Sequence, residues 1–130
     1  MTAPDALPCG IVLFAHGSRD PDWRAPIEAV AARMRALDPA ARVACAYLEH
    51  TRPDLPAAVQ TLLAAGARAI AIWPMFLGVG RHARADLPRL VDELRAKHPD
   101  IAFALHPAIA EHPAVLEALA LAALTGEVQE

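Results

Sequence analysis

The chain has 130 residues, of which 55% are hydrophobic, and its 12 basic and 15 acidic side chains leave a net charge of −3. This length suits one folded domain, expected over residues 1–130 with a lead-in over 1–9 and a tail over 125–130. The sequence contains no block of basic residues, which excludes the footprint of a nucleic-acid-binding protein. Its apolar runs fall short of the about 20 residues that a membrane span needs, and the acidic N-terminus is unlike a signal peptide.

The first half of the chain alternates between two patterns. A short apolar run, Gly10–Ala15, is typical of a strand buried on both faces, and the spacing of apolar residues over 27–37 predicts a helix. A second strand is predicted over Arg42–Leu48. The next helix begins near Leu55 and ends at Gly66, a residue type that often follows the last turn.

The second half repeats the alternation. A strand over Arg68–Trp73 precedes a helix over Asp86–Lys97, and a strand over Ile101–Leu105 precedes a helix over Val115–Leu124. Such an order predicts the α/β class, with an open parallel sheet of four to five strands flanked by helices in a flavodoxin-like three-layer sandwich. Four or five strands are too few for a closed (β/α)8 barrel.

The two cysteines, Cys9 and Cys45, lie far apart and form no Cys-x-x-Cys pattern. This spacing argues against an iron–sulfur cluster and against a thiolate zinc site. Both residues lie in or beside strand-like segments, where reduced cysteine packs as a small hydrophobic residue. We therefore expect a protein of the reducing cytoplasm.

Open parallel sheets bind ligands at the carboxyl ends of their strands. Polar residues follow all four predicted strands there: His16-Gly17-Ser18-Arg19-Asp20, Glu49-His50, the loop from Pro74 to His82, and His106-Pro107. A strand must become polar where it leaves the core, but this requirement does not explain why four of the six histidines gather at one edge.

His16 is the sharpest candidate for chemistry. It follows an apolar strand directly, and Gly17 permits a tight turn beside it. A neutral imidazole can bind a metal or act as a base; the alternative is a histidine that only satisfies structural hydrogen bonds. Ser18, Arg19 and Asp20 could cap the following helix or pair with one another, and for Asp20 we favour that structural role.

A strand followed by Arg-His-Gly marks the histidine phosphatases, which pass phosphoryl groups through histidine. Here Ala15 stands where the phosphate-clamping arginine would be. Phosphoryl transfer is therefore a weak alternative.

The third loop contains Gly78 and Gly80, which allow a close approach of backbone to a ligand, and His82, expected just before a helix. No Gly-Lys-Ser/Thr follows, so the loop is not a P-loop. The apolar segment Met75–Leu77 is either core or the wall of a pocket for a flat hydrophobic ligand.

Glu49 could be a general base, a metal ligand or a helix-capping carboxylate. Two histidines and a carboxylate without thiolates suit a first-row divalent metal ion. Beside a flat apolar wall, this set suggests a metal ion delivered to a planar organic ligand. His98 reads as a surface residue, and His50, His106 and His112 remain ambiguous.

Three motifs make the chain resemble the class II tetrapyrrole chelatases, of the small single-domain sirohydrochlorin cobaltochelatase and ferrochelatase type. They are HGSRDPDW (16–23), YLEHTRPDLPAAV (47–59) and PMFLGVGRHARADLP (74–88), and the match covers most of residues 10–119. The chain departs from the family pattern at Arg81 and at Ala110, where glycine is usual, which puts substrate fit and loop shape in question.

The resemblance implies an enzyme that inserts a divalent metal ion, Co²⁺ foremost and Fe²⁺ or Ni²⁺ otherwise, into sirohydrochlorin. The metal is then a substrate, and no tightly bound cofactor is expected. His16 and His82 would hold the incoming ion, and they or Glu49 would accept the pyrrole protons. The residues implied as contacts for the macrocycle's carboxylates are Ser18, Arg19, Gly78, Gly80 and Arg81.

The resemblance also implies a homodimer, because larger relatives build one cleft from two such domains. A different class of function stays open at this point. A module that binds metal or tetrapyrrole without turnover would carry the same residues, and the Arg81 departure favours it.

Overall fold

The computed structural model describes residues 8–78 and 80–127, and it describes only the backbone at 81–84. In this part of the chain strands and helices alternate, with two short 3-10 helices, η1 and η2. The elements are β1 (Cys9–Ala15), η1 (Pro21–Arg24), α1 (Ala25–Leu37), β2 (Arg42–Tyr47), α2 (Leu55–Ala64), β3 (Ala69–Pro74), α3 (Arg81–Lys97), β4 (Ala102–Leu105), η2 (Ile109–Glu111) and α4 (Pro113–Thr125).

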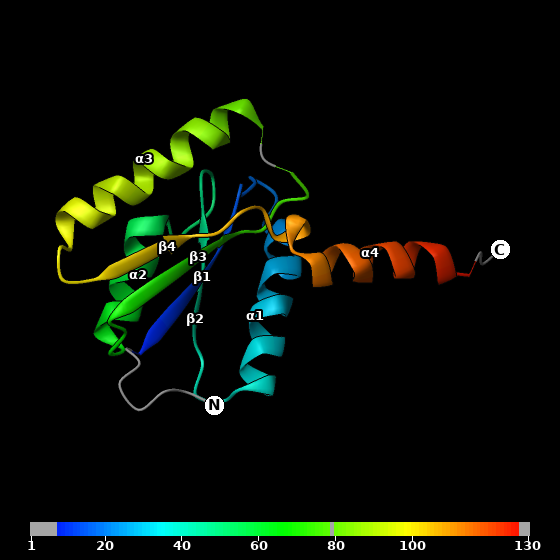
Figure 1. Ribbon diagram of the computed structural model, residues 1–130, viewed down its shortest axis with the longest axis horizontal. Coiled ribbons are helices and arrows are strands. Elements are labelled where there is room, and N and C mark those ends of the chain that lie inside the picture. The colour runs from blue at the N-terminus through cyan, green and yellow to red at the C-terminus, as the bar shows by residue number, and fades with distance from the viewer. Residues whose placement is uncertain (1–7, 79, 128–130) are drawn as a thin grey trace.

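The described strands form one parallel sheet in the order β2-β1-β3-β4. Helices α2 and α3 lie on one face of this sheet and α1 lies on the other, which makes three layers (Figure 1). The predicted α/β class and parallel sheet are confirmed, with four strands at the lower end of the expected range. The strand order reverses direction between β1 and β3, and this is where open α/β sheets place their ligand sites.

The larger part of the core lies under α2 and α3. Alternate residues of β1 and β3 point into it, among them Phe14 and Ile72, and they meet Val59 of α2 and Val91 of α3. All four are at most 1% exposed. Period-two alternation in the strands and the helical spacing of apolar residues in α2 and α3 therefore produce one continuous apolar layer.

The opposite face holds a smaller cluster beneath α1. Leu13 of β1 and Val43 of β2 pack there against Ala31, with Trp73 and Met75 partly buried at its margin. Both cysteines are free thiols. Cys45 is half-buried beside this cluster, whereas Cys9 is exposed at the start of β1, so the expectation that both pack as small hydrophobic residues is wrong for Cys9.

Helix α3 begins at Arg81, five positions before the predicted start at Asp86. The prediction rested on the helical spacing of the large apolar residues, which begins at Leu87, and residues 81–85 contain none. Pro88 lies inside the helix, where one missing N–H donor is tolerated because good helix formers precede it. His82 therefore lies in the first turn of α3, which corrects the expectation that it would precede the helix.

The division of residues 1–130 into a lead-in, a domain and a tail stays a prediction. β1 begins at Cys9, within the predicted lead-in, and α4 runs to Thr125, the first residue of the predicted tail. Residues 1–7 and 128–130 lie outside the described part. Within that part, none of the helices has the length and apolar character needed to cross a membrane.

Candidate functional site

The loops after β1 and β2 are joined backbone to backbone. Leu48 donates its N–H to the carbonyl of Ala15 at 2.9 Å, and Glu49 donates to the carbonyl of His16 at 3.0 Å. The chain passes through Gly17 with a φ of +84°, and a Cβ there would lie 1.9 Å from the carbonyl oxygen of Glu49. Only glycine fits this position, so Gly17 fixes the turn that presents His16.

A second connection lies one step further along the same loops. Ser18 donates its N–H to Oγ1 of Thr51 at 3.0 Å, and the Thr51 hydroxyl donates to the carbonyl of Ser18 at 2.9 Å. The Ser18 hydroxyl accepts the Asp20 N–H at 3.1 Å, and the Asp20 carboxylate accepts the Asp22 N–H at 2.9 Å at the start of η1. Asp20 therefore has the structural role predicted for it.

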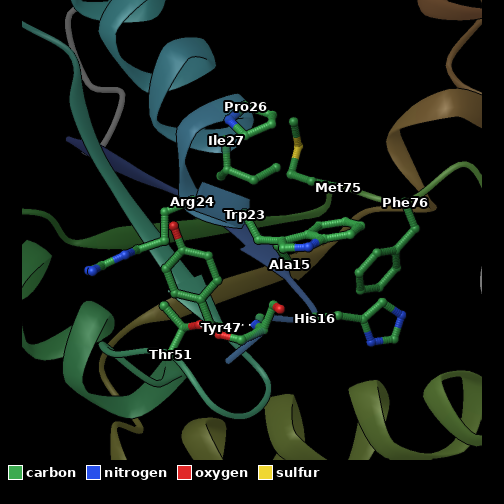
Figure 2. Close-up of a pocket in the computed structure, with 12 residues that line it drawn as sticks. Ala15, His16, Trp23, Arg24, Pro26, Ile27, Tyr47, Thr51, Met75 and Phe76 are labelled. Carbon is green, nitrogen blue, oxygen red and sulfur yellow. Dashed lines mark hydrogen bonds between the residues drawn. The ribbon is translucent and has the colours of Figure 1, made fainter. Parts of the chain in front are cut away.

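These loops border a cavity of about 510 Å³ at the carboxyl ends of β1, β2 and β3 (Figure 2). Its wall is mostly apolar and aromatic, with His16 and Ser18 among its polar groups. The lining residues are Ala15, His16, Gly17, Ser18, Trp23, Arg24, Pro26, Ile27, Tyr47, Thr51, Met75 and Phe76.

Phe76 lies against the His16 imidazole, with ring centroids 4.4 Å apart and an interplanar angle of 31° (Figure 2). Phe76 is buried and belongs to the core cluster, while Met75 is half-buried, and both line the cavity. Met75 and Phe76 therefore pack against the core and also form part of the cavity wall, which are the two alternatives that the sequence left open for this segment. Leu77 is 79% exposed and does not line this cavity. The cavity wall also contains Trp23, which is 66% exposed.

Tyr47 is the last residue of β2, and it also lines the cavity. Its ring is buried, and its hydroxyl has no hydrogen-bond partner among the described residues. Burial raises the pKa of the Tyr47 phenol, and the nearby Cys45 and Glu28 add to the increase. Burial is also the main cause that raises the pKa of the Cys45 thiol, and Glu28 adds to the increase.

A second hollow of about 490 Å³ lies on the other side of the β3 end. It includes Gly78 and His106, and the His106 ring stacks on Trp73 at a centroid distance of 3.9 Å and an angle of 1°. No described atom would lie within 4 Å of a Cβ at Gly78 or Gly80. The structure thus separates Gly78 from the cavity that contains His16 and Ser18.

Glu49 lies at the margin of the site. Its Oε2 is 3.8 Å from Nε2 of His50, and its side chain is 60% exposed. It caps no helix among the described residues, so a structural capping role is not supported. Arg19 borders a third, shallower hollow beside Ser18, and Arg24 and Arg52 also line it.

Several lining residues were not predicted from the sequence. Trp23, Tyr47, Thr51 and Arg52 fall within the first two motifs, and Arg24 directly follows the first. Their side-chain directions depend on how the two loops are joined. The sequence signal that could have pointed to them is Trp23, which belongs to the same motif as His16.

The described side chains include no group of three or more His, Cys, Asp or Glu residues that could hold a metal ion. His16 is the member of the predicted metal pair that the structure describes. The side chains of His82 and Arg81 lie outside the described residues, so the predicted pairing of His16 with His82 stays a prediction. His112 accepts the Ala114 N–H through Nδ1 at 3.1 Å and caps α4.

A family model named CbiX matches residues 10–123. The sirohydrochlorin cobaltochelatase of Priestia megaterium is 28% identical over 109 residues, which is 84% of this chain and 35% of that protein. The sirohydrochlorin cobaltochelatase of Methanococcus maripaludis is 30% identical over 81 residues, which is 62% of this chain and 56% of that protein. This chain therefore spans about a third to somewhat over half of the length of these relatives.

Among solved structures, a putative cobalamin (vitamin B12) biosynthesis CbiX protein from Marinobacter aquaeolei VT8 superimposes with a TM-score of 0.77 at 30% identity. The superposition covers 90% of this chain and 95% of that one. This agreement extends over nearly the whole of both chains, so the similarity includes the arrangement of strands that builds the cavity.

Proposed function

The chain belongs to the CbiX family, and we propose from this membership that it is a sirohydrochlorin chelatase, a lyase-class enzyme. Its substrates are sirohydrochlorin and a divalent metal ion. Co²⁺ is the first candidate because the matched relatives are cobaltochelatases, and Fe²⁺ and Ni²⁺ are the others. The product belongs to the cobalamin and siroheme class of cofactors. The free thiols of Cys9 and Cys45 support the cytoplasm as its compartment.

The observation that carries this proposal is the apolar cavity with His16 at its edge. A macrocycle is flat and apolar on its faces, so it matches walls formed by Trp23, Met75 and Phe76. The ring of Phe76 holds the His16 imidazole beside this space. An imidazole here could meet a metal ion at the face of the bound ring.

Metal insertion exchanges a divalent ion for two pyrrole N–H protons, so the reaction needs a ligand for the ion and an acceptor for the protons. Imidazole serves either purpose near neutral pH. His16 is the candidate for the first contact with the ion. His82 is the second candidate ligand, and Glu49 with its neighbour His50 can receive protons at the exposed margin of the site.

The carboxylate arms of sirohydrochlorin require cationic partners. Arg19, Arg24 and Arg52 line one hollow next to the cavity, and Ser18 lines both. Arginine matches carboxylates with two parallel hydrogen bonds. These three side chains therefore extend the predicted contacts of Ser18 and Arg19, while Gly78, Gly80 and Arg81 remain candidate contacts on the opposite side.

We also expect the site to work as a homodimer. Trp23 and Leu77 are 66% and 79% exposed at the edge of the sheet where the cavity opens. Large exposed apolar side chains around a ligand site are typical of a surface that a partner covers. A second copy facing this edge would complete the cleft.

The test is a chelation assay with sirohydrochlorin and Co²⁺, Fe²⁺ or Ni²⁺ in parallel at controlled free metal concentration. The protein should change the visible spectrum faster than the uncatalysed reaction with at least one metal. His16→Ala should lower that rate by about 100-fold or more, the usual loss on removing a general base or ligand. His98→Ala is the matched control, because His98 ends α3 away from the cavity.

Lack of acceleration with every metal would overturn the chelatase. If the same samples then bound metal or tetrapyrrole stoichiometrically, the binding module would replace it. Full activity in His16→Ala would overturn the assignment of His16 but not the reaction.

A further inference from the structure

A further hollow, of about 440 Å³, lies at the β2 edge of the sheet. Its walls come from η1, α1, α2, β2 and the loop that follows β2, and we name it the edge hollow by its lining residues Arg24, Arg35, Cys45, Tyr47 and Arg52. Arg24 and Tyr47 also line the cavity that contains His16. These two residues therefore stand at the border between the cavity and the edge hollow.

The charged lining of the edge hollow is mostly basic. Arg24, Arg35 and Arg52 line it together with one carboxylate, Glu28. The Arg35 guanidinium already donates to the carbonyl of Val43 at 2.9 Å. Neither Arg24 nor Arg52 takes part in an ion pair within the part of the chain that the structure describes. Two cations at this border are thus available to an anion.

The Tyr47 hydroxyl is directed to the same border. Alternation along β2 places Tyr47 on the side of α1, as it does Val43 and Cys45. Tyr47 is 3% exposed, and its hydroxyl has no hydrogen-bond partner among the residues described. In Figure 2 the hydroxyl oxygen points toward Arg24 and away from His16.

An unpartnered buried hydroxyl lowers stability, and phenylalanine would fill the same space without that loss. Such a group beside two unpaired cations indicates a ligand that carries an acceptor oxygen. Burial raises the pKa of the Tyr47 phenol, so the group keeps its proton at neutral pH and serves as a donor. A carboxylate satisfies both requirements, because it accepts hydrogen bonds and pairs with guanidinium groups.

A ligand oxygen can reach the Tyr47 hydroxyl from the cavity by way of Arg24. Arg24 is exposed, so its long side chain can change rotamer without disturbing the core. A macrocycle that lies against Trp23 and Phe76 carries its carboxylate arms at its perimeter. An arm on the β2 side of the ring therefore extends past Tyr47 toward the edge hollow.

We propose that the edge hollow is the subsite for one carboxylate arm of the tetrapyrrole, held by Arg24 and Arg52, and that the Tyr47 hydroxyl donates the hydrogen bond that selects a carboxylate there. This inference rests on the proposed function, because it takes the tetrapyrrole as the ligand of the cavity. It makes Tyr47 a residue that determines specificity, since its hydroxyl points away from His16. A ring substituent without acceptor oxygens would leave the hydroxyl and both cations unpaired.

The first test is equilibrium dialysis with metal-free sirohydrochlorin. Y47F should raise the Kd by about 10-fold or more, the loss expected for a hydrogen bond to a charged acceptor. R24M should raise it by at least as much. R68M is the matched arginine control, because Arg68 precedes β3 at the opposite end of the sheet, and T125V is the hydroxyl control at the end of α4. Both controls should bind like the wild type.

Two further comparisons show whether the hydroxyl and Arg24 share one carboxylate. In the double variant Y47F/R24M the rise in Kd should be smaller than the product of the two single effects. With the methyl ester of sirohydrochlorin, which keeps the ring and loses the negative charges, the wild type, Y47F and R24M should bind alike. The urea midpoint of Y47F should not fall, which separates weaker binding from loss of folding.

Equal binding of sirohydrochlorin by Y47F and the wild type would overturn the subsite. An equal loss with the acid and with the ester would overturn it too, because the hydroxyl would then act on the ring rather than on a carboxylate.

The chelation assay on the same samples separates this inference from the proposed function. Y47F should raise the KM for sirohydrochlorin by the same factor as the Kd and leave kcat unchanged. An active enzyme whose KM is unchanged in Y47F and R24M overturns the subsite and leaves the chelatase intact. Weaker sirohydrochlorin binding by both variants, in a protein that inserts no metal, supports the subsite and counts against the chelatase. A wild type that does not bind sirohydrochlorin overturns both.

Discussion

The two halves of the sheet differ in how far helices cover them. The β1–β2 half has α1 on one face and α2 on the other, and its loops are joined by hydrogen bonds from Leu48, Glu49 and Thr51. The β3–β4 half has α3 on one face and the alanine pairs Ala69–Ala102 and Ala71–Ala104 on the other, and its loop passes through glycines with open space around them. The closed half holds His16 in a fixed place.

The largest expected effect separates the covered and uncovered faces of the β3–β4 half. Leu94 of α3 is buried in the core, and Leu121 of α4 is 51% exposed. Leu94→Ala should lower the free energy of unfolding by about 2–5 kcal/mol, because it leaves a cavity. Leu121→Ala should cost less than about 0.5 kcal/mol, because its side chain is largely exposed.

Urea unfolding at low protein concentration measures both variants. Equal losses for Leu94→Ala and Leu121→Ala would show that α4 is already packed within one copy, and the contrast between the two faces would be wrong.

The next largest effect compares the loop after β1, which contains Gly17, with the loop after β3, which contains Gly78. Gly17→Ala combines a positive φ with a clash against the Glu49 carbonyl, so it should cost about 1–3 kcal/mol or more. Gly78→Ala meets open space and should leave the stability nearly unchanged. Thermal unfolding of the two variants gives the comparison. If Gly17→Ala were as stable as Gly78→Ala, the loops after β1 and β2 would be able to move apart at little cost, and the contrast between the two loops would be wrong.

The hydroxyl of Thr51 tests how much one side chain contributes to joining the closed half. Thr51→Val keeps the shape and removes both hydrogen bonds with Ser18, so it should cost about 1–2 kcal/mol. Thr61→Val on exposed α2 surface loses a single bond to the Ala57 carbonyl and is the control. Urea midpoints that fall equally in both variants would contradict a special role for Thr51.

The smallest effect concerns Tyr47, the one tyrosine of the chain. Its hydroxyl lacks a partner among the described residues, so Tyr47→Phe should keep the stability or raise it by up to about 1 kcal/mol. Burial raises the pKa of the folded phenol, so the wild type is favoured below the ordinary tyrosine pKa of about 10 and loses stability as the pH rises above it.

The advantage of Tyr47→Phe should therefore grow above about pH 10. Unfolding free energies of both proteins from neutral to alkaline pH test this sign. A constant difference would mean that the phenol titrates alike in the folded and unfolded chains.

The alternation of apolar runs and helical periods determined the fold class and the order of strands and helices along the chain, and it indicated the edge of the sheet to search for a site. These features follow from the sequence because each depends on local spacing. His16 was predicted as a candidate in the same way, since it follows a buried strand directly, and the structure places it at a cavity. The start of α3 was misjudged because its first residues, 81–85, contain no large apolar side chain and so show no helical period.

Only the tertiary structure decided which residues share a cavity. Trp23, Tyr47 and Thr51 join His16 because two loops distant in sequence are hydrogen-bonded together, and no local pattern encodes that register. The outward direction of α4 is of the same kind. The sequence determined that α4 is an apolar helix, and the corner at Glu111 and His112 decided that its apolar surface remains uncovered within one copy.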